Sequence, residues 1–263
     1  MTHPGGSHEF GVIIPARFAS TRLPGKPMLD LGGKPMIVRV MEVASAAGAA
    51  FILVATDDER IADAVTEAGG EAILTSLEHE TGTDRLAEVA RRKHLAPEQV
   101  IVNLQGDEPA LPAELVQRVA QTLAAEPGAR IATLATPLRD RRELFDPNVV
   151  KVVLDQGGRA LYFSRAPIPW LRDDFATPEA RTTSTPLPDD TFLRHIGLYA
   201  YRVETLLTLS QTRQAPLEEA ENLEQLRALW LGMQIQVAIV PEVPSSGVDT
   251  AEDAERVRRL FAE

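Results

Sequence analysis

The chain has 263 residues, a formal net charge of −11 at pH 7 and no cysteine. The absence of cysteine excludes disulfides, thiolate catalysis and cysteine–zinc sites. The negative charge argues against a broad nucleic-acid surface, which needs a positive face, but a small polyanion could bind where basic residues gather.

Length and composition indicate a soluble globular protein. The length suits one large α/β domain or a main domain with a smaller lobe. No apolar run is long enough to span a bilayer, and the opening MTHPGGSHEF lacks the basic and apolar regions of a signal peptide. We therefore expect a cytoplasmic protein in which residues 1–9 form a flexible lead-in.

Short apolar runs alternate with helical patterns through the first half of the chain. The apolar runs predict buried strands, and apolar residues at helical spacing predict the helices between them. Pro35 suits the first turn of one helix, and Thr56-Asp57-Asp58 is a helix-start signal. The expected strands are 10–14, 51–55, 72–74, 99–104 and 130–136, and the expected helices are 35–47, 59–68, 83–93 and 112–124.

This alternation predicts a Rossmann-like α/β fold, an open and mostly parallel sheet with helices on both faces. After about residue 137 the pattern changes to strands at 149–154, 160–163 and 196–201, around a Pro-, Thr- and Asp-rich loop at 173–191. We interpret residues 140–205 as a β-rich insertion in a single domain that spans 10–263. A helix at 216–231, a strand at 235–240 and a helix at 250–261 complete the chain.

The loop after the first strand gathers basic residues. Its sequence, PARFASTRLPGKP, carries Arg17, Arg22 and Lys26 with no acidic residue among them. Backbone amides of residues 16–20 and these three cations could bind a triphosphate, although the loop has neither a Walker P-loop nor a dinucleotide fingerprint. A solvated basic turn is the alternative. The position after the first strand favours phosphate binding, because ligands of open α/β sheets lie beyond the carboxyl ends of the strands.

Two aspartates follow later strands of the predicted sheet. Asp107 follows the strand 99–104 in QGDEP, and Asp249 follows the strand 235–240 in GVDT. Mg²⁺ prefers carboxylate oxygens and usually keeps water and phosphate oxygens as its other ligands, so two aspartates suit it. The alternatives are a turn-forming role for Asp107 before Pro109 and a helix cap at Asp249.

The basic loop also resembles a known family. RLPGKP followed by LGGKPM resembles the signature of sugar-activating nucleotidyltransferases, and the wider PARFASTRLPGKP resembles the CMP-Kdo synthetases, the 3-deoxy-manno-octulosonate (Kdo) cytidylyltransferases. Further matching stretches cover nearly the whole chain from Phe10 onward: VATDDERIADAV, TGTDRLAEV, IVNLQGDEP, NVVKVVLD, ALYFSRAPIPW, RHIGLYAYR, LEEAENLEQLRALW and PSSGVDTAEDAERV. The resemblance implies transfer of CMP from CTP to Kdo for lipopolysaccharide biosynthesis, and a homodimer that pairs through the 140–205 insertion.

The resemblance also implies roles for individual residues. Asp107 and Asp249 match the family's magnesium-binding aspartates, and Lys26 and Arg22 would offset charge on the β- and γ-phosphates. The residues expected at the nucleotide are Pro15, Ala16, Arg17, Ser20, Thr21, Arg22, Lys26, Arg85 and Gln105. The residues expected at the sugar are Gln105, Arg165, His195, Tyr199, Glu224 and Gln225.

Alternatives remain open for these residues and for the function. Arg85 could lie on the solvated face of its helix, Glu224 and Gln225 could belong to the polar face of an amphipathic helix, and His195 and Tyr199 could be ordinary packing residues. A cytidylyltransferase for another acidic sugar, such as sialic acid, would share the carboxylate-binding arginine. A non-catalytic nucleotide-binding protein could use the same fold.

Overall fold

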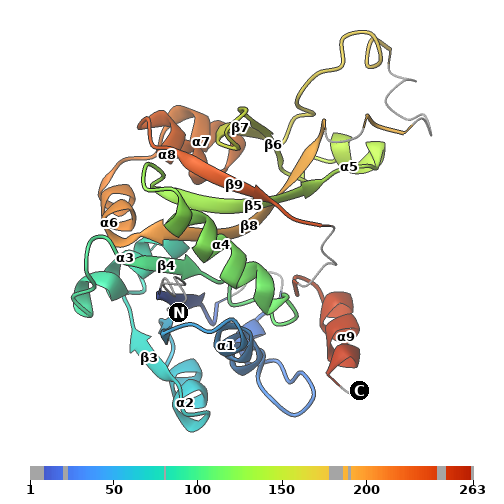
Figure 1. The fold of residues 1–263 in the computed structure, drawn as a ribbon. Helices are drawn as coiled ribbons and strands as arrows, with labels where there is room; N and C mark the ends of the chain where they lie inside the picture. The colour runs from blue at the N-terminus through green and yellow to red at the C-terminus, as the bar shows by residue number, and fades with distance from the viewer. Residues whose placement is uncertain are drawn as a thin grey trace, which may run out of the picture. The chain divides into compact units, whose positions relative to one another are not determined.

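The computed structural model describes residues 9–19, 23–79, 81–177, 186–188, 191–241 and 247–261. The chain divides into two compact units (Figure 1). The first unit comprises Met1–Ala125, Leu198–Gln211 and Ser245–Glu263, and the second comprises Glu126–Gly197 and Thr212–Pro244. Of the segment 140–205, residues up to 197 therefore belong to the second unit and the remainder to the first.

The first unit is built on parallel strands in the order β3-β2-β1-β4. These strands are β1 (Phe10–Ala16), β2 (Phe51–Thr56), β3 (Glu71–Leu74) and β4 (Val100–Asn103), and residues 199–202 of β8 (Leu193–Arg202) pair antiparallel with β4. Strand β1 has a neighbour on each side, and Val12, Ile13 and Ile14 are fully buried. This explains why the strand has a continuous apolar sequence.

Six α-helices and one short 3-10 helix belong to the described part of the first unit. They are α1 (Met36–Ala46), α2 (Glu59–Glu67), α3 (Gly82–Arg92), α4 (Ala113–Ala125), α6 (Val203–Gln211), α9 (Ala251–Leu260) and the 3-10 helix η1 (Lys26–Met28). Helices α1 and α4 contact each other, as do α3 and α6. Side-chain oxygens of Asp58, Thr81 and Thr250 cap α2, α3 and α9 by accepting hydrogen bonds from backbone N–H groups of the first turn.

The second unit holds shorter strands and helices. Strand β5 (Ile131–Pro137) pairs parallel with β9 (Ile235–Ile239), and β6 (Lys151–Leu154) pairs antiparallel with β7 (Ala160–Ser164) and with the start of β8. Its helices are α5 (Arg141–Phe145), α7 (Pro216–Glu221) and α8 (Gln225–Trp230), of which α8 packs on β7.

The expected open α/β sheet is confirmed, and three helical details differ from the expectation. The helix predicted at 216–231 is broken at Asn222, whose φ of 51° is left-handed, so α7 and α8 are separate. Helix α5 has only five residues, which is too short for a periodic pattern. Helix α6 follows β8 without a loop, so no turn residue marks its start in the sequence.

Candidate active site

A cavity of about 240 Å³ lies in the first unit, where β1 and β4 end. It gathers residues from the basic loop, from the loop after β4 and from the start of α3. Its lining residues are Pro15, Ala16, Arg17, Lys26, Pro27, Met36, Gly82, Gln105, Gly106 and Asp107. The structure therefore brings together most of the described residues that were expected at the nucleotide. Their place beyond the carboxyl ends of parallel strands is where open α/β sheets bind ligands.

Two glycines allow the backbone conformations that shape this cavity. A Cβ atom on Gly106 would lie 2.6 Å from the carbonyl oxygen of Pro15, so a larger residue would push the loop after β4 away from the end of β1. Gly25 has a φ of 71°, a left-handed conformation that glycine adopts at little cost. The 3-10 helix that presents Lys26 begins directly after it.

The ammonium group of Lys26 lies between two carboxylates. Its Nζ donates to Oδ2 of Asp107 at 2.8 Å and to Oδ1 of Asp249 at 3.0 Å. The Lys26 side chain is 10% exposed, whereas those of Asp107 and Asp249 are 40% and 63% exposed. Burial lowers the pKa of Lys26, but the hydrogen bonds and charges of the two aspartates outweigh it and leave the pKa above its usual 10.5. The side chain is therefore charged at neutral pH.

The two aspartate loops are also joined through the backbone, since the N–H of Val248 donates to the carbonyl of Asp107 at 2.9 Å. The alternative reading of Asp249 as a helix cap is wrong. The cap of α9 is Thr250, whose Oγ1 accepts from the N–H of Asp253 at 3.1 Å while the Asp253 carboxylate accepts from the N–H of Thr250. Asp249 therefore does not cap α9, and its carboxylate accepts from Lys26.

The remaining loop candidates divide into described and undescribed residues. Arg17 lines the cavity, and its Nη2 donates to the carbonyl of His79 at 2.7 Å. Ser20, Thr21 and Arg22 lie outside the described residues.

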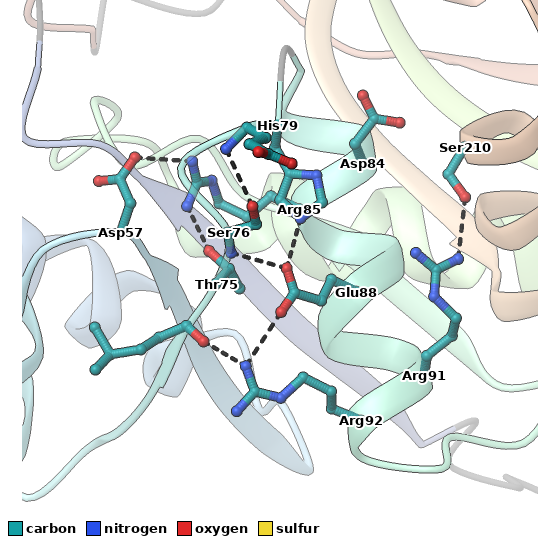
Figure 2. A network of polar contacts seen from close by, with 12 residues as sticks. Asp57, Thr75, Ser76, His79, Asp84, Arg85, Glu88, Arg91, Arg92 and Ser210 are labelled. Carbon is teal, nitrogen blue, oxygen red and sulfur yellow. Dashed lines mark hydrogen bonds and ion pairs between the residues drawn. The ribbon is translucent and has the colours of Figure 1, made fainter.

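Arg85 is fully buried, so the alternative that it lies on a solvated helix face is wrong. Its Nη2 donates to Oδ2 of Asp57 at 2.9 Å and its Nη1 donates to Oγ1 of Thr75 (Figure 2). Burial lowers its pKa, a nearby Arg17 acts in the same direction, and Asp57 opposes both. Arg85 does not line the 240 Å³ cavity.

Arg165 of the second unit is held by backbone carbonyls. Its Nε donates to the carbonyl of Glu221 at 2.7 Å, its Nη1 to that of Pro147 at 2.8 Å and its Nη2 to that of Asn222 at 3.4 Å. The Glu221 carboxylate accepts from Ser164 Oγ at 2.6 Å and from the Arg165 N–H at 2.9 Å. Contacts with described residues use three of the five guanidinium N–H groups in this way, so two could donate to a ligand.

His195 is a neutral residue in this structure. Its Nε2 lies 3.0 Å from Oγ1 of Thr133, and the Phe163 ring packs edge-on at 5.0 Å between centroids. Burial lowers its pKa from 6.5 to about 3. A neutral imidazole can exchange hydrogen bonds with a hydroxyl, but it offers no charge to a carboxylate.

The other sugar candidates differ in exposure. Gln225 is 8% exposed, and its Nε2 has no hydrogen-bond partner among the described residues. The alternative that it belongs to an exposed polar face is therefore wrong, while Glu224 is exposed. Tyr199 is half-buried and stacks on Tyr201 with 5.7 Å between centroids. By unit, Tyr199 belongs to the first, and Arg165, His195, Glu224 and Gln225 belong to the second.

The comparison with family models decides the classification. The model described as "Cytidylyltransferase" matches residues 11–235. The chain belongs to the cytidylyltransferase family. The match includes the basic loop, Asp107 and every sugar candidate, and it ends before Asp249.

One solved structure agrees with this classification, and a second, more distant one agrees with the fold. The chain is 42% identical to CMP:2-keto-3-deoxy-manno-octonic acid synthetase complexed with CTP, over 97% of this chain and 98% of that one, with a TM-score of 0.84. A cytidylyltransferase from Leptospira borgpetersenii serovar Hardjo-bovis is 17% identical over 95% of this chain and 85% of that one, with a TM-score of 0.60, and supports the fold alone. Within the described residues, no helix combines the length and apolar character needed to cross a membrane.

A larger cavity of about 840 Å³ in the first unit contains none of the candidate residues. It lies between α1, α2 and the first residues of β2, and its lining includes Val38, Met41, Phe51 and Gly70. Its walls include the amino end of β2, whereas ligands of such sheets bind beyond the carboxyl ends. We assign it no role in the reaction.

Sequence reasoning missed Asp57, His79 and Glu221, which contact candidate residues directly, and Glu88, which acts through His79. One signal was available for Asp57, because it follows β2 directly and so lies at the same edge of the sheet as the end of β1. It was interpreted as part of a helix start, whereas the cap is Asp58. His79 acts through its backbone carbonyl, which a sequence motif does not encode.

Proposed function

We propose that this protein is a 3-deoxy-manno-octulosonate cytidylyltransferase, which transfers CMP from CTP to Kdo and releases pyrophosphate. The observation that carries the proposal is the 42% identity, across 97% of the chain, to a CMP:2-keto-3-deoxy-manno-octonic acid synthetase complexed with CTP. The cavity lined by Lys26 and Asp107 supports the proposal, because it lies beyond the carboxyl ends of parallel strands.

In the proposed reaction, the anomeric hydroxyl of Kdo attacks the α-phosphorus of CTP in line and pyrophosphate leaves. No covalent enzyme intermediate is needed, so the chain requires positioning and charge stabilisation rather than a nucleophile. Pro15, Ala16, Arg17, Gln105 and the undescribed Ser20 and Thr21 would bind the nucleotide. Lys26 and Arg22 would offset the negative charge that grows on pyrophosphate as it departs.

Asp107 and Asp249 would hold Mg²⁺. Their carboxylates converge on one point, since both lie within 3.0 Å of the same ammonium nitrogen, and both are partly exposed. Within the described part of the chain no group of three or more acidic, His or Cys side chains could hold a metal by itself, which suits an ion that keeps water and phosphate oxygens as ligands. When bound, Mg²⁺ would supply charge neutralisation at the phosphate oxygens and favour ionisation of the attacking hydroxyl.

The sugar would be bound by Gln105, Arg165, His195, Tyr199, Glu224 and Gln225. The two unused N–H groups of Arg165 can meet the Kdo carboxylate, and the neutral His195 suits a hydroxyl. The buried Nε2 of Gln225 lacks a partner among the described residues, and such a group gains most from a polar ligand. We further propose that the enzyme is a cytoplasmic homodimer whose product enters lipopolysaccharide biosynthesis.

Pyrophosphate release with each sugar and each nucleotide, in the presence of Mg²⁺, tests this proposal. We expect release only when CTP and Kdo are both present. Release with sialic acid in place of Kdo would show a different acidic-sugar specificity. CTP binding without release, with either sugar, would show a nucleotide-binding protein without catalysis and would overturn the proposal.

A further inference from the structure

Two chains of contacts lead from helix α3 to consecutive residues of the basic loop. They start at Arg85 and Glu88, which are one turn apart on α3 and therefore on the same face (Figure 2). They end at Arg17 and Phe18, next to Ala16 at the end of β1. Of the residues in the two chains only Arg17, at the end of the second, lines the cavity.

The first chain runs from Arg85 through Asp57 to the backbone of Phe18. Arg85 Nη2 lies 2.9 Å from Asp57 Oδ2, and Asp57 Oδ1 accepts a long hydrogen bond of 3.5 Å from the Phe18 N–H. The Phe18 carbonyl accepts from the Gly25 N–H at 3.2 Å, and the guanidinium carbon of Arg60 lies 3.4 Å from the centre of the Phe18 ring. Phe18 is therefore held at its amide, its carbonyl and its ring.

The second chain runs from Glu88 through His79 to the side chain of Arg17. Glu88 Oε2 lies 2.5 Å from His79 Nε2 and accepts from the Ser76 N–H at 3.0 Å, and the His79 carbonyl accepts from Arg17 Nη2 at 2.7 Å. Burial acts to raise the pKa of Glu88, but the hydrogen bonds from Ser76 and His79 outweigh it and leave the pKa below its usual value. Glu88 is therefore an anion that fixes the segment before α3.

Burial separates Arg85 from any substrate. The side chain of Arg85 is 0% exposed and that of Asp57 is 10% exposed. A buried ion pair of this kind contributes little net stability compared with apolar residues of the same volume, but losing one partner leaves an uncompensated charge. The pair is therefore better explained by what it positions than by the stability it adds.

We propose that Arg85 and Glu88 are positioning residues that fix Arg17 and Phe18 for binding of the CTP triphosphate. The inference rests on the proposed function, because the triphosphate is the ligand that the basic loop would bind. A loop already held in its bound conformation spends less conformational entropy when the nucleotide arrives. Loss of either chain should therefore weaken CTP binding and leave binding of the acidic sugar unchanged.

The test compares Arg85→Met and Glu88→Gln with the matched control Arg91→Met. Arg91 lies on the same helix but is turned towards Ser210 Oγ, 3.3 Å away, so this change removes the same charge without touching either chain (Figure 2). In Arg85→Met and Glu88→Gln we expect faster amide hydrogen exchange in residues 16–19 and a KM for CTP raised about tenfold. The KM for Kdo should stay within about twofold, and the control should behave like the wild type.

The double variant Asp57→Ala with Arg85→Met guards against a folding defect, because alanine carries neither the charge nor the oxygen that accepts from the Phe18 N–H. Removing both charges should restore the unfolding midpoint relative to Arg85→Met alone, while Phe18 remains unheld and the KM for CTP remains raised. Return of that KM to the wild-type value along with stability would overturn the inference, because the pair would then be merely structural. Unchanged hydrogen exchange in residues 16–19 would also overturn it. That exchange needs no substrate, so it decides the inference even if the wild type released no pyrophosphate and the proposed function failed.

Discussion

At the scale of single residues, one ammonium group joins the two acids of the candidate active site. Lys26 donates to Asp107 and to Asp249, which come from loops far apart in the sequence. The three side chains form one hydrogen-bonded group in which a single ammonium faces two carboxylates, so a change in one alters the surroundings of the other two. Because the three groups are coupled, their roles are best distinguished by measuring how each variant changes kcat and KM.

We expect Asp107→Asn and Asp249→Asn each to reduce kcat by roughly a hundredfold, because a neutral amide cannot replace a carboxylate at a metal or stabilise the Lys26 charge equally. The fold should persist, since Asn still offers an oxygen to Lys26. Pyrophosphate release titrated with Mg²⁺ measures the effect, with thermal unfolding as the control. Near-normal turnover at saturating Mg²⁺ would remove that residue from the metal site.

Arg165→Lys should chiefly raise the KM for Kdo, by roughly ten- to a hundredfold, because lysine keeps the charge but loses the planar fork. The KM for CTP should barely change. Steady-state kinetics with each substrate varied in turn separates the two constants. Since Arg165 also bonds three backbone carbonyls, unfolding curves must accompany the kinetics. An equal rise in the KM for CTP would place Arg165 at the nucleotide or in the supporting structure.

His195 predicts a dependence of stability on pH. Its folded-state pKa of about 3 lies below the usual 6.5, so between these values the unfolded chain binds the extra proton. The free energy of unfolding should therefore fall as pH drops from 6.5 towards 3. Urea unfolding of the wild type and of His195→Asn at pH 7.5 and 5.5 isolates this contribution. A wild-type-minus-variant difference that does not shrink at the lower pH would contradict it.

At the scale of elements, the start of α9 explains how Asp249 remains available to Lys26. Thr250 and Asp253 cap each other's backbone N–H groups, and Arg256 lowers the pKa of Asp253 to about 2 through a hydrogen bond to its carboxylate. Thr250→Ala should therefore cost about 1 kcal/mol of unfolding free energy. Asp249→Asn should leave this cap intact. Chemical denaturation measures both variants, and an unchanged unfolding free energy in Thr250→Ala would overturn the assignment of the cap to Thr250.

The cap also shows how far the sequence could predict the fold. The strands β1 to β4 of the first unit were found within one or two residues, because each has a short apolar run, although β3 contains no buried residue. The cap was misplaced by one residue, since Asp and Thr in succession both suit it. The break at Asn222 was missed because left-handed asparagine has no distinctive pattern in a polar stretch.

The candidate site could be predicted where a charged or polar residue lies in the loop that follows a strand. Lys26, Asp107 and Gln105 follow that rule, and one cavity gathers them. Arg85 follows it only partly, because a sequence indicates which helix carries a guanidinium but not that its side chain is fully buried. The contacts of Arg85 depend on Asp57 and Thr75, which come from different segments and meet only after folding.

At the scale of the whole molecule, the exposed apolar side chains of the second unit favour self-association. Leu161 on β7 is 60% exposed, Trp230 at the end of α8 is 59% exposed and Trp170 is 49% exposed. Large exposed aromatic and aliphatic side chains are typical of subunit interfaces, and closed two-fold pairs are the commonest soluble assemblies. Because the chain carries a net charge of −11, electrostatic repulsion opposes random association, and a specific apolar contact is needed to overcome it.

We therefore predict a homodimer of twice the 28.7 kDa chain mass at micromolar concentration, measured by light scattering. If the second unit forms the interface, Leu161→Asp should shift the mass towards the monomer, because burying an unpaired carboxylate in an apolar contact is costly. Leu77→Asp is the matched control, since Leu77 is 80% exposed and belongs to the first unit. A monomeric wild type would rule out the dimer. If Leu77→Asp were monomeric while Leu161→Asp remained a dimer, the interface would lie on the first unit.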